Sequence, residues 1–386
     1  MLGYDARKID TIYKTVMNDE PKSSVPDINS KIHSLTPRRV KTQSFLRFLL
    51  PFQRGRDIMY SMTNLRGDIM THIIDVKFYP GWTRKAITFS IDDGILDMDR
   101  KFMDIVEPYG IKGAFNLCSE RLNQMSPEEY RECYRGHEIA NHCKYHPAAF
   151  IDGCEYEIAK EKFDPASADP SKLYHYEGEP GLYHTVRPWG GWMKRADTDA
   201  FIRLIEESHS ELEAIFGEGS IRAFVWPYIR QDNKRLTDYV SSIPHYYSER
   251  LDSCVGVDPK IYFAPPDDHF FYLCARQKNL LAMAESFESL PDDGELKFFC
   301  FGVHSIDYEK ADKWGDLLEF AKTYGARPED YFYATIAEIY DYAKATKSVG
   351  ITDTEIKNPT KIDLYIKIDG RRHILKAGRS IRLEDN

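Results

Sequence analysis

Two adjacent aspartates, Asp92 and Asp93, end a strongly apolar stretch of the sequence, and Gly94 then permits a sharp turn. Two neighbouring carboxylates in a semi-buried site are not comfortably ionised unless a cation compensates them. The tripeptide Asp-Asp-Gly also occurs in ordinary turns. The pattern alone therefore leaves a turn and a cation-binding site as alternatives.

Two histidines lie four residues apart in a second motif, GHEIANHCKYHP. A helical or turn geometry would put the imidazoles of His142 and His146 on one side, as a two-histidine metal site requires. With Asp93 they would form a two-histidine, one-carboxylate set that leaves positions for water and substrate, which suits catalytic zinc or iron. Two surface histidines near a proline are the alternative interpretation.

Two later strand-like stretches carry further polar groups at their ends. Arg222 precedes AFVW, and Pro227-Tyr228 follow it. An arginine can hold a carboxylate ionised and correctly aimed, and a backbone N–H after the proline could face an oxyanion. His304 follows LKFFCFGV, where it could act as a general acid near neutral pH. Taken singly, the first two are better explained by packing, and a structural histidine is the alternative for His304.

In order and spacing, these groups together resemble the polysaccharide deacetylases, also called carbohydrate esterase family four or the nodulation-protein B homology domain. The resemblance covers residues 80–345 and is strongest at 84–147, 222–228 and 298–304. It implies a distorted (β/α) barrel with fewer than eight regular strands. It also implies a hydrolase that removes acetyl groups from an N-acetylated or, as a second choice, O-acetylated saccharide.

The resemblance assigns the base and the metal ligands residue by residue. Asp92 would be the catalytic base, and Asp93, His142 and His146 would bind one divalent metal, for which zinc is expected. His137 is expected to lie outside the metal's coordination shell.

The remaining roles follow from the same resemblance. Arg222 would orient Asp92, the backbone of Tyr228 would complete the oxyanion hole, and His304 would protonate the leaving group. Three tryptophans are expected to contact the sugar: Trp189, Trp192 and Trp226. A small core within their own segment is the alternative for the first two.

The sequence departs from the family pattern in three places. Cys143 stands where the family usually has serine or threonine, and a thiol so close to a metal could bind it or be oxidised. Ile229 follows Tyr228 where glycine is common. The segment that normally tunes the acid histidine is missing, and three carboxylates are candidates by position: Asp267, Asp268 and Asp307.

Strand-like and helix-like patterns alternate around these groups, which favours a parallel sheet, either closed or open. The expected strands are 85–91, 112–117, 136–141, 222–227, 245–250, 260–266 and 296–303. The expected helices include the apolar periodicities at 102–109, 201–216, 280–290, 314–321 and 336–343.

Three regions are expected along the chain. Residues 1–80 form an N-terminal accessory arm, and 81–350 form the catalytic barrel. Its long aromatic insertion, 151–198, is of a length usually associated with function or a lid. Residues 351–386 form a C-terminal β extension with antiparallel strands.

Composition limits the partners. The net charge is −9, and there is no long basic run of the kind that nucleic-acid binding usually needs. A neutral or weakly charged substrate is therefore expected. The longest apolar patch, 45–52, is too short to span a membrane. No secretory signal is visible, and the seven cysteines contain no C-x-x-C pair. A cytoplasmic location is expected, with a removed signal as the alternative, and oligomerisation stays open.

Two other functions compete with the saccharide deacetylase. One is hydrolysis of a small non-sugar amide on the same fold. The other is a catalytically silent carbohydrate-binding protein, which would not need the base, the ligands and the acid together.

Overall fold

The computed structural model describes residues 53–54, 57–63, 69–187, 191–228, 230–243, 246–251, 262–273 and 280–383. All of them belong to one compact unit, which spans Pro51–Asn386.

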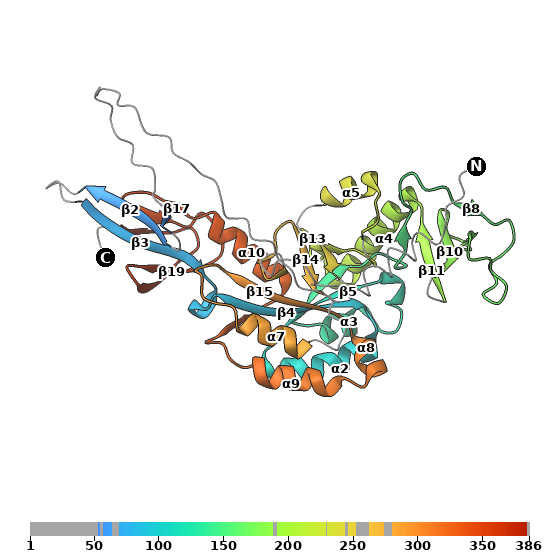
Figure 1. The fold of residues 1–386 in the computed structure, drawn as a ribbon, viewed down its shortest axis with the longest axis horizontal. Coiled ribbons are helices and arrows are strands. Elements are labelled where there is room, and N and C mark those ends of the chain that lie inside the picture. The colour runs from blue at the N-terminus through green and yellow to red at the C-terminus, as the bar shows by residue number, and fades with distance from the viewer. Residues whose placement is uncertain are drawn as a thin grey trace, which may run out of the picture. The chain divides into compact units, whose positions relative to one another are not determined.

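A nearly closed barrel of seven parallel strands forms the centre of this unit (Figure 1). In spatial order the strands are β4 (Lys85–Asp93), β5 (Gly113–Leu117), β6 (Glu138–Asn141), β12 (Ala223–Val225), β13 (Tyr246–Leu251), β14 (His269–Leu273) and β15 (Lys297–His304). β15 then pairs with β4 and closes the ring, while β16 (Tyr331–Tyr333) pairs with the beginning of β4. The expected distorted (β/α) barrel is thereby confirmed.

The two faces of β4 differ in chemistry, because side chains alternate along a strand. Ile87, Phe89 and Ile91 belong to the core shared with the outer helices, and the Phe89 ring lies 5.1 Å from that of Phe102 and 5.2 Å from that of Phe320. The other face carries small or polar residues and ends at Asp92. Alternation thus brings a carboxylate to the inner, carboxyl-terminal end of the barrel, where (β/α) barrels build their sites.

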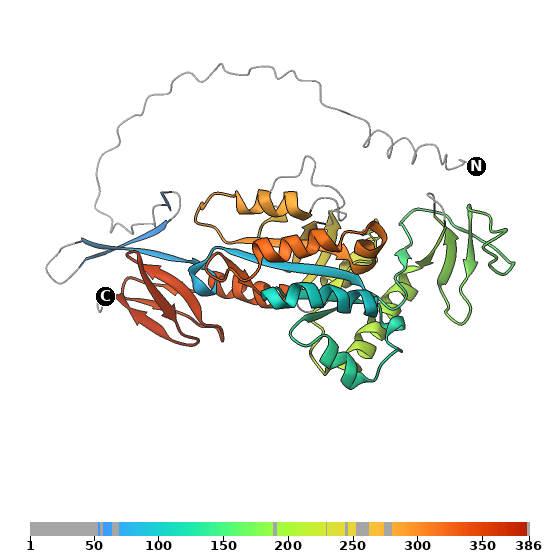
Figure 2. The same cartoon turned by 90° about the horizontal axis from the view of Figure 1, so that it is seen from below.

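Helices surround the barrel and connect its strands. They are α2 (Leu96–Val106), α3 (Pro127–Cys133), α4 (Thr198–Phe216), α5 (Lys234–Ser241), α7 (Leu280–Glu288), α8 (Ser305–Ala311), α9 (Trp314–Tyr324) and α10 (Ile336–Lys347), with short 3-10 turns at Pro80–Trp82, Glu107–Tyr109 and Ser119–Arg121. Figures 1 and 2 show α2 and α9 side by side along the barrel strands. In the described part of the chain no helix has the length and apolar character needed to cross a membrane.

A second sheet joins the two ends of the compact unit. Its order is β1 (Gln53–Arg54), β2 (Asp57–Thr63), β3 (Ile69–Phe78), β19 (Leu364–Ile368) and β20 (Arg371–Leu375). A small sheet of β17 (Gly350–Ile351), β18 (Glu355–Lys357) and β21 (Ser380–Arg382) accompanies it. The end of the expected N-terminal arm and the expected C-terminal extension therefore form one sheet, because β3 pairs with β19.

The long insertion forms four of the five strands of a separate sheet. Its order is β7 (Ala148–Ala149), β11 (Trp192–Ala196), β10 (Leu182–Val186), β9 (Lys172–His175) and β8 (Glu157–Ile158). β11 runs into α4, whose first turn is capped by the Asp197 carboxylate accepting from the Ala200 N–H.

One expected strand is wrong. Residues 262–266 are not a strand, and the barrel strand in this region is β14, which begins at His269. Pro265 and Pro266 explain the shift, because proline cannot donate a hydrogen bond to a sheet ladder.

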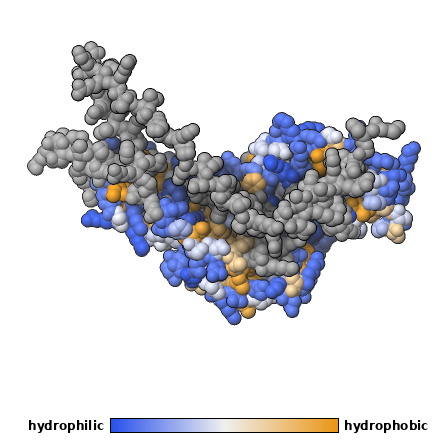
Figure 3. Space-filling model, in the orientation of Figure 1, coloured by the Kyte–Doolittle hydropathy of each residue, from blue (hydrophilic) through white to orange (hydrophobic). Residues whose placement is uncertain are grey.

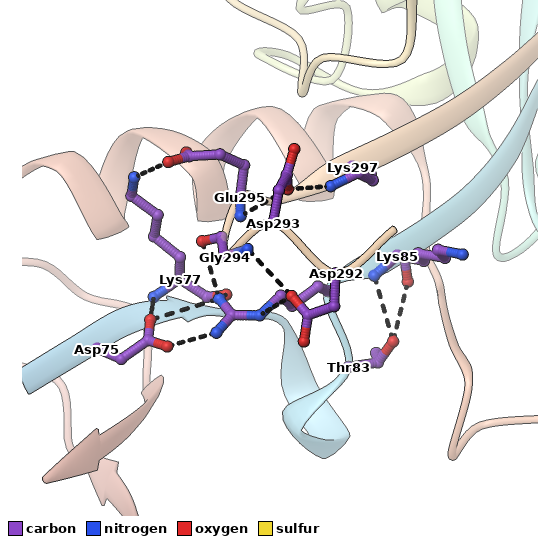
Figure 4. A network of polar contacts seen from close by, with 10 residues as sticks. Asp75, Lys77, Thr83, Lys85, Asp292, Asp293, Gly294, Glu295 and Lys297 are labelled. Carbon is purple, nitrogen blue, oxygen red and sulfur yellow. Dashed lines mark hydrogen bonds and ion pairs between the residues drawn. The ribbon is translucent and has the colours of Figure 1, made fainter. Parts of the chain in front are cut away.

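A partly buried ion-pair network fastens the terminal sheet to the beginning of the barrel (Figure 4). The Arg84 guanidinium pairs with Asp75, donates to the Lys77 carbonyl at 2.7 Å and the Gly294 carbonyl at 3.0 Å, and lies 4.0 Å from the Phe78 ring centroid. Asp75 and Arg84 are each about one-eighth exposed, at 12% and 13%. On the face that Figure 3 shows, the described surface is mainly hydrophilic, and apolar residues lie in separate areas.

Replacing Arg84 with methionine should lower the apparent Tm by several degrees, since Asp75, which is only 12% exposed, would lose its cation. Breaking a fully buried pair typically costs ~3–5 kcal/mol, which is an upper bound for this partly buried one. The matched control is Lys77→Met, which removes a cation whose ion pair with Glu295 is 42% and 60% exposed. Exposed pairs contribute below ~1 kcal/mol, so this control should hardly shift the Tm. Equal shifts in thermal unfolding would contradict the account of the junction.

Candidate metal centre

Asp93 leaves the strand geometry at the end of β4. Its backbone has φ +84°, and Gly94 continues the turn at φ +70°. Regular alternation would direct Asp93 outward, opposite to Asp92, so this turn is what allows its carboxylate to meet the histidines. Positive φ is uncommon for a non-glycine residue and tends to mark functional sites.

His142 follows β6, and a hydrogen bond fixes the orientation of its ring. Its Nδ1 lies 2.8 Å from the Val225 carbonyl, so Nδ1 carries the proton and Nε2 is left with a lone pair. The Asn141 side chain shapes the following turn by accepting from the Cys143 N–H at 2.9 Å and donating to the Ile205 carbonyl at 2.9 Å.

Asp93, His142 and His146 meet as one cluster. Their ligand atoms all lie within 4.8 Å of one another, and Asp93 Oδ1 is 3.4 Å from His146 Nε2 and 3.8 Å from His142 Nε2. Asp93 Oδ1 and His142 Nε2 are buried without a hydrogen-bond partner among the described residues. Buried polar atoms normally have partners, so this donor set fits a divalent metal.

The local charges favour the protonation states that metal binding needs. Burial alone would raise the pKa of Asp93, but His146, His304, His142 and Arg121 together hold it well below its usual range. Burial lowers the pKa of His146 to about 3, against the opposing charge of Asp93. At neutral pH the cluster therefore offers an ionised carboxylate and a neutral His146 imidazole.

Asp92 is held inside the barrel mouth. It is only 3% exposed, the Asn116 amide donates to its Oδ1 at 2.6 Å, and the Tyr272 hydroxyl lies 3.2 Å from its Oδ2. In the β4–β15 register Asp92 is the direct partner of His304. The base and acid suggested by the sequence thus lie on adjacent strands.

His304 pairs with Asp307 one turn later, with Nδ1 3.2 Å from Oδ2. Burial opposes protonation, but the Asp307 hydrogen bond and the charges of Asp92 and Asp93 raise the pKa of His304 to about 9. Of the three candidate tuning carboxylates, the structure selects Asp307.

The other two tuning candidates face a different element. Asp267 and Asp268 pair with Lys347 and Lys344 of α10, at 3.1 and 3.0 Å.

A pocket of about 660 Å³ opens over the cluster and is lined by Asp93, His146, His304 and Tyr228. The Tyr228 ring lies 4.4 Å from the His146 ring, and its backbone has φ +60°. Trp192, which is 48% exposed, lines the same pocket and so stands where it could contact a sugar.

Arg222 does not lie where the resemblance placed it. It precedes β12, at the opposite end of the strand from Trp226, and its guanidinium binds both oxygens of Asp341 at 2.6 and 2.7 Å. The donors that hold Asp92 are Asn116 and Tyr272, so the assignment of Arg222 as the residue that orients Asp92 is corrected.

Two of the three tryptophan assignments do not place a ring in the pocket. Trp226 is 2% exposed and packs between Phe224 and Phe201, so it is a core residue and not a substrate contact. Trp189 lies outside the described residues, as does Ile229.

Two further sequence expectations concern residues close to the metal ligands. His137 lies apart from the cluster, with its ring nitrogens next to the Gly113 N–H and the Glu107 carboxylate. Cys143 is fully buried in an apolar cluster, and burial raises the pKa of its thiol to about 12. A thiol so far from ionisation is a poor metal ligand.

Sequence reasoning missed Asn116, Tyr272 and Arg121. Asn116 had a signal, since it is a polar residue in the otherwise apolar strand GAFNL. Tyr272 lies on the strand whose position was wrongly expected. Arg121 donates to the Asp93 carbonyl at 3.0 Å from the 3-10 turn after β5, and no motif marks it.

Comparison with known proteins identifies the domain. Residues 81–247 match the family model described as polysaccharide deacetylase. This part of the chain is a polysaccharide deacetylase domain. The match confirms the resemblance drawn from the motifs, and with it the enzyme class, a polysaccharide deacetylase-like hydrolase. No curated protein matches the chain significantly.

Solved structures of similar deacetylases and esterases share low sequence identity with this chain. A family 4 acetyl xylan esterase from Clostridium thermocellum, in complex with a cobalt ion, is 13% identical, with a TM-score of 0.38 over 66% of this chain and 89% of that one. Peptidoglycan deacetylase PdaC from Bacillus subtilis is 12% identical, with a TM-score of 0.35 over 68% and 95%. A polysaccharide deacetylase from Bacillus cereus is 14% identical, with a TM-score of 0.36 over 65% and 92%. At these TM-scores the sequence match, and not the structural likeness, carries the assignment.

His142→Ala should abolish metal binding by the deacetylase domain, because it removes one of three clustered ligands. After equilibration with zinc and removal of the excess, elemental analysis should find about one ion per native chain and almost none in the variant. His209→Ala is the matched control, since His209 lies on α4 with its side chain 41% exposed and is not part of the cluster. Retention of a full equivalent of zinc by His142→Ala would refute this assignment.

Proposed function

We propose that the deacetylase domain is a zinc-dependent hydrolase that removes an acetyl group from an N-acetylated or O-acetylated saccharide. The cluster of Asp93, His142 and His146 carries this proposal, because it faces a pocket that His304 also lines. Two imidazoles and one carboxylate leave coordination positions open for water and a carbonyl oxygen, as catalytic zinc sites do.

A divalent metal bound by these residues would lower the pKa of a water and polarise the acetyl carbonyl. Asp92 takes the proton from the attacking water, and the donors Asn116 and Tyr272 keep its carboxylate aimed. The backbone N–H of Tyr228 is the proposed oxyanion donor.

His304 completes the reaction by giving its proton to the leaving nitrogen. Attack of the water oxygen on the acetyl carbon forms the new C–O bond first. The C–N bond of the acetamide then breaks as the nitrogen takes the proton of His304, and the products are acetate and a free amine. A pKa of about 9 keeps the His304 imidazole protonated at neutral pH, as a general acid requires.

The saccharide assignment rests on the family and on the wall of the pocket. Trp192 exposes a flat aromatic surface there, and such rings are suited to packing against the apolar face of a sugar.

Asp92→Asn should lower acetate release from N-acetylated oligosaccharides at least ~100-fold, because an amide cannot accept the proton. Its zinc content should stay at the native value, since Asp92 is not a member of the cluster. Asp97→Asn, an exposed aspartate on α2, is the control and should keep full activity.

The same assay separates the alternatives. Release from small acetamides alone would replace the saccharide by a small-amide substrate. If the native protein binds oligosaccharides but releases acetate from no substrate, it is a binding protein. If Asp92→Asn keeps native activity, Asp92 is not the catalytic base.

Asp307→Asn should move the alkaline limb of the kcat profile to lower pH. The Asp307 carboxylate raises the pKa of His304, so its loss lowers that pKa, and the general acid then loses its proton earlier as the pH rises. Asp312→Asn removes the same charge from the exposed end of α8, where asparagine tolerates the left-handed backbone, and should leave the limb in place. If Asp307→Asn leaves the alkaline limb of the kcat profile in place, the titration of His304 does not determine that limb.

A further inference from the structure

The pocket over the metal cluster is lined by more basic than acidic residues, although the whole chain carries a net charge of −9. Five basic side chains line it: Arg121, Arg187, Lys194, Arg250 and Lys310. The net charge of the chain predicts a neutral or weakly charged substrate, but a substrate meets the local charge of the pocket and not the average of the surface.

The acidic residues of the pocket are already engaged. Glu120 forms an ion pair with Lys194 at 3.0 Å, and Asp307 pairs with His304 at 3.2 Å. Asp93 belongs to the metal cluster and lies 3.7 Å from the Arg121 guanidinium. The acidic residues of the pocket therefore lie beside Lys194 and Arg121 and do not balance the charges of Arg187 and Lys310.

Arg187 and Lys310 have no carboxylate partner among the described residues. Arg187 donates to the Tyr228 hydroxyl at 3.2 Å, and its Nε is buried with no hydrogen-bond acceptor in the described part of the chain. Burying a guanidinium N–H without an acceptor is unfavourable, so an acceptor from a ligand would stabilise this arrangement.

Arg187 also lies close to the metal cluster. Its guanidinium carbon is 5.8 Å from the Tyr228 ring centroid, and that ring lies 4.4 Å from the His146 ring. Arg187 therefore stands only one side chain away from a metal ligand. A group bound by Arg187 would belong to the same sugar as the acetyl group or to its neighbour.

We propose that the saccharide is anionic and carries a carboxylate or a phosphate that Arg187 and Lys310 bind beside the acetyl group. This inference rests on the proposed function, whose pocket it uses. The planar Arg187 guanidinium can hold either oxyanion through two hydrogen bonds, while Lys310 supplies a point charge from α8.

Calorimetry with three matched ligands tests the proposal on the full-length, zinc-loaded Asp92→Asn protein. The ligands are a neutral acetamido sugar, the same sugar with a carboxylate, and its phosphate ester. At least one anionic ligand should bind about 10- to 100-fold tighter than the neutral one, the range expected of a hydrogen-bonded charge. Which anion binds tighter identifies the source of the charge, and equal affinity for all three ligands would overturn the proposal.

Variants in the same background assign the preference to its residues. Arg187→Gln and the exposed Lys310→Met should each reduce the ratio of anionic to neutral affinity, and Lys310→Met tests the idea even if the first variant misfolds. Lys322→Met removes an equal charge from an exposed position on α9 outside the pocket and should leave the ratio unchanged. If none of the pocket variants alters the ratio of anionic to neutral affinity, the proposal is also overturned.

Acetate release by the native enzyme is measured separately with the same ligands. If all three ligands bind equally and acetate is released, the anionic preference is wrong and the proposed deacetylase function stands. If an anionic ligand binds more tightly but no ligand releases acetate, the anionic preference stands and the proposed deacetylase function is wrong.

Discussion

Two consecutive carboxylates at the end of β4 must point in different directions, and the site depends on this constraint. A regular strand already separates the side chains of Asp92 and Asp93, with Asp92 on the inner face. The backbone of Asp93, at φ +84°, then turns its carboxylate to within 3.4 Å of His146. One residue thereby becomes a buried proton acceptor and the next becomes a metal ligand, although the two are chemically identical.

The surrounding structure maintains this division of roles. Of the two carboxylates, Asn116 and Tyr272 contact the inner one, that of Asp92. The Val225 carbonyl orients His142 so that its free nitrogen faces the outer one, that of Asp93. These supporting groups come from three different strands of the barrel, β5, β14 and β12. The ring of paired strands, fastened to the terminal sheet at Arg84, is therefore what keeps the acid, base and ligands in register.

The sequence reveals much of the site because its key residues follow apolar strands. Asp92, Asp93, His142 and His304 each end or directly follow a segment whose hydrophobic pattern is clear, so their common location at one edge of the barrel is predictable. Arg222 is not, because it precedes a three-residue strand and the pattern does not tell which end it occupies. Burial of Trp226 and the pairing of β3 with β19 depend on contacts between distant segments, which local patterns do not contain.

The central claim is that Asp93, His142 and His146 share one metal ion while Asp92 stays free to take a proton. A crystal structure of the zinc-loaded protein with an anomalous difference map at the zinc edge tests it most directly. The account predicts one peak at ~2.0–2.2 Å from Asp93 and both histidines, with Asp92 outside the coordination shell. A peak coordinated by Asp92 or His304 in place of one of these three would contradict it.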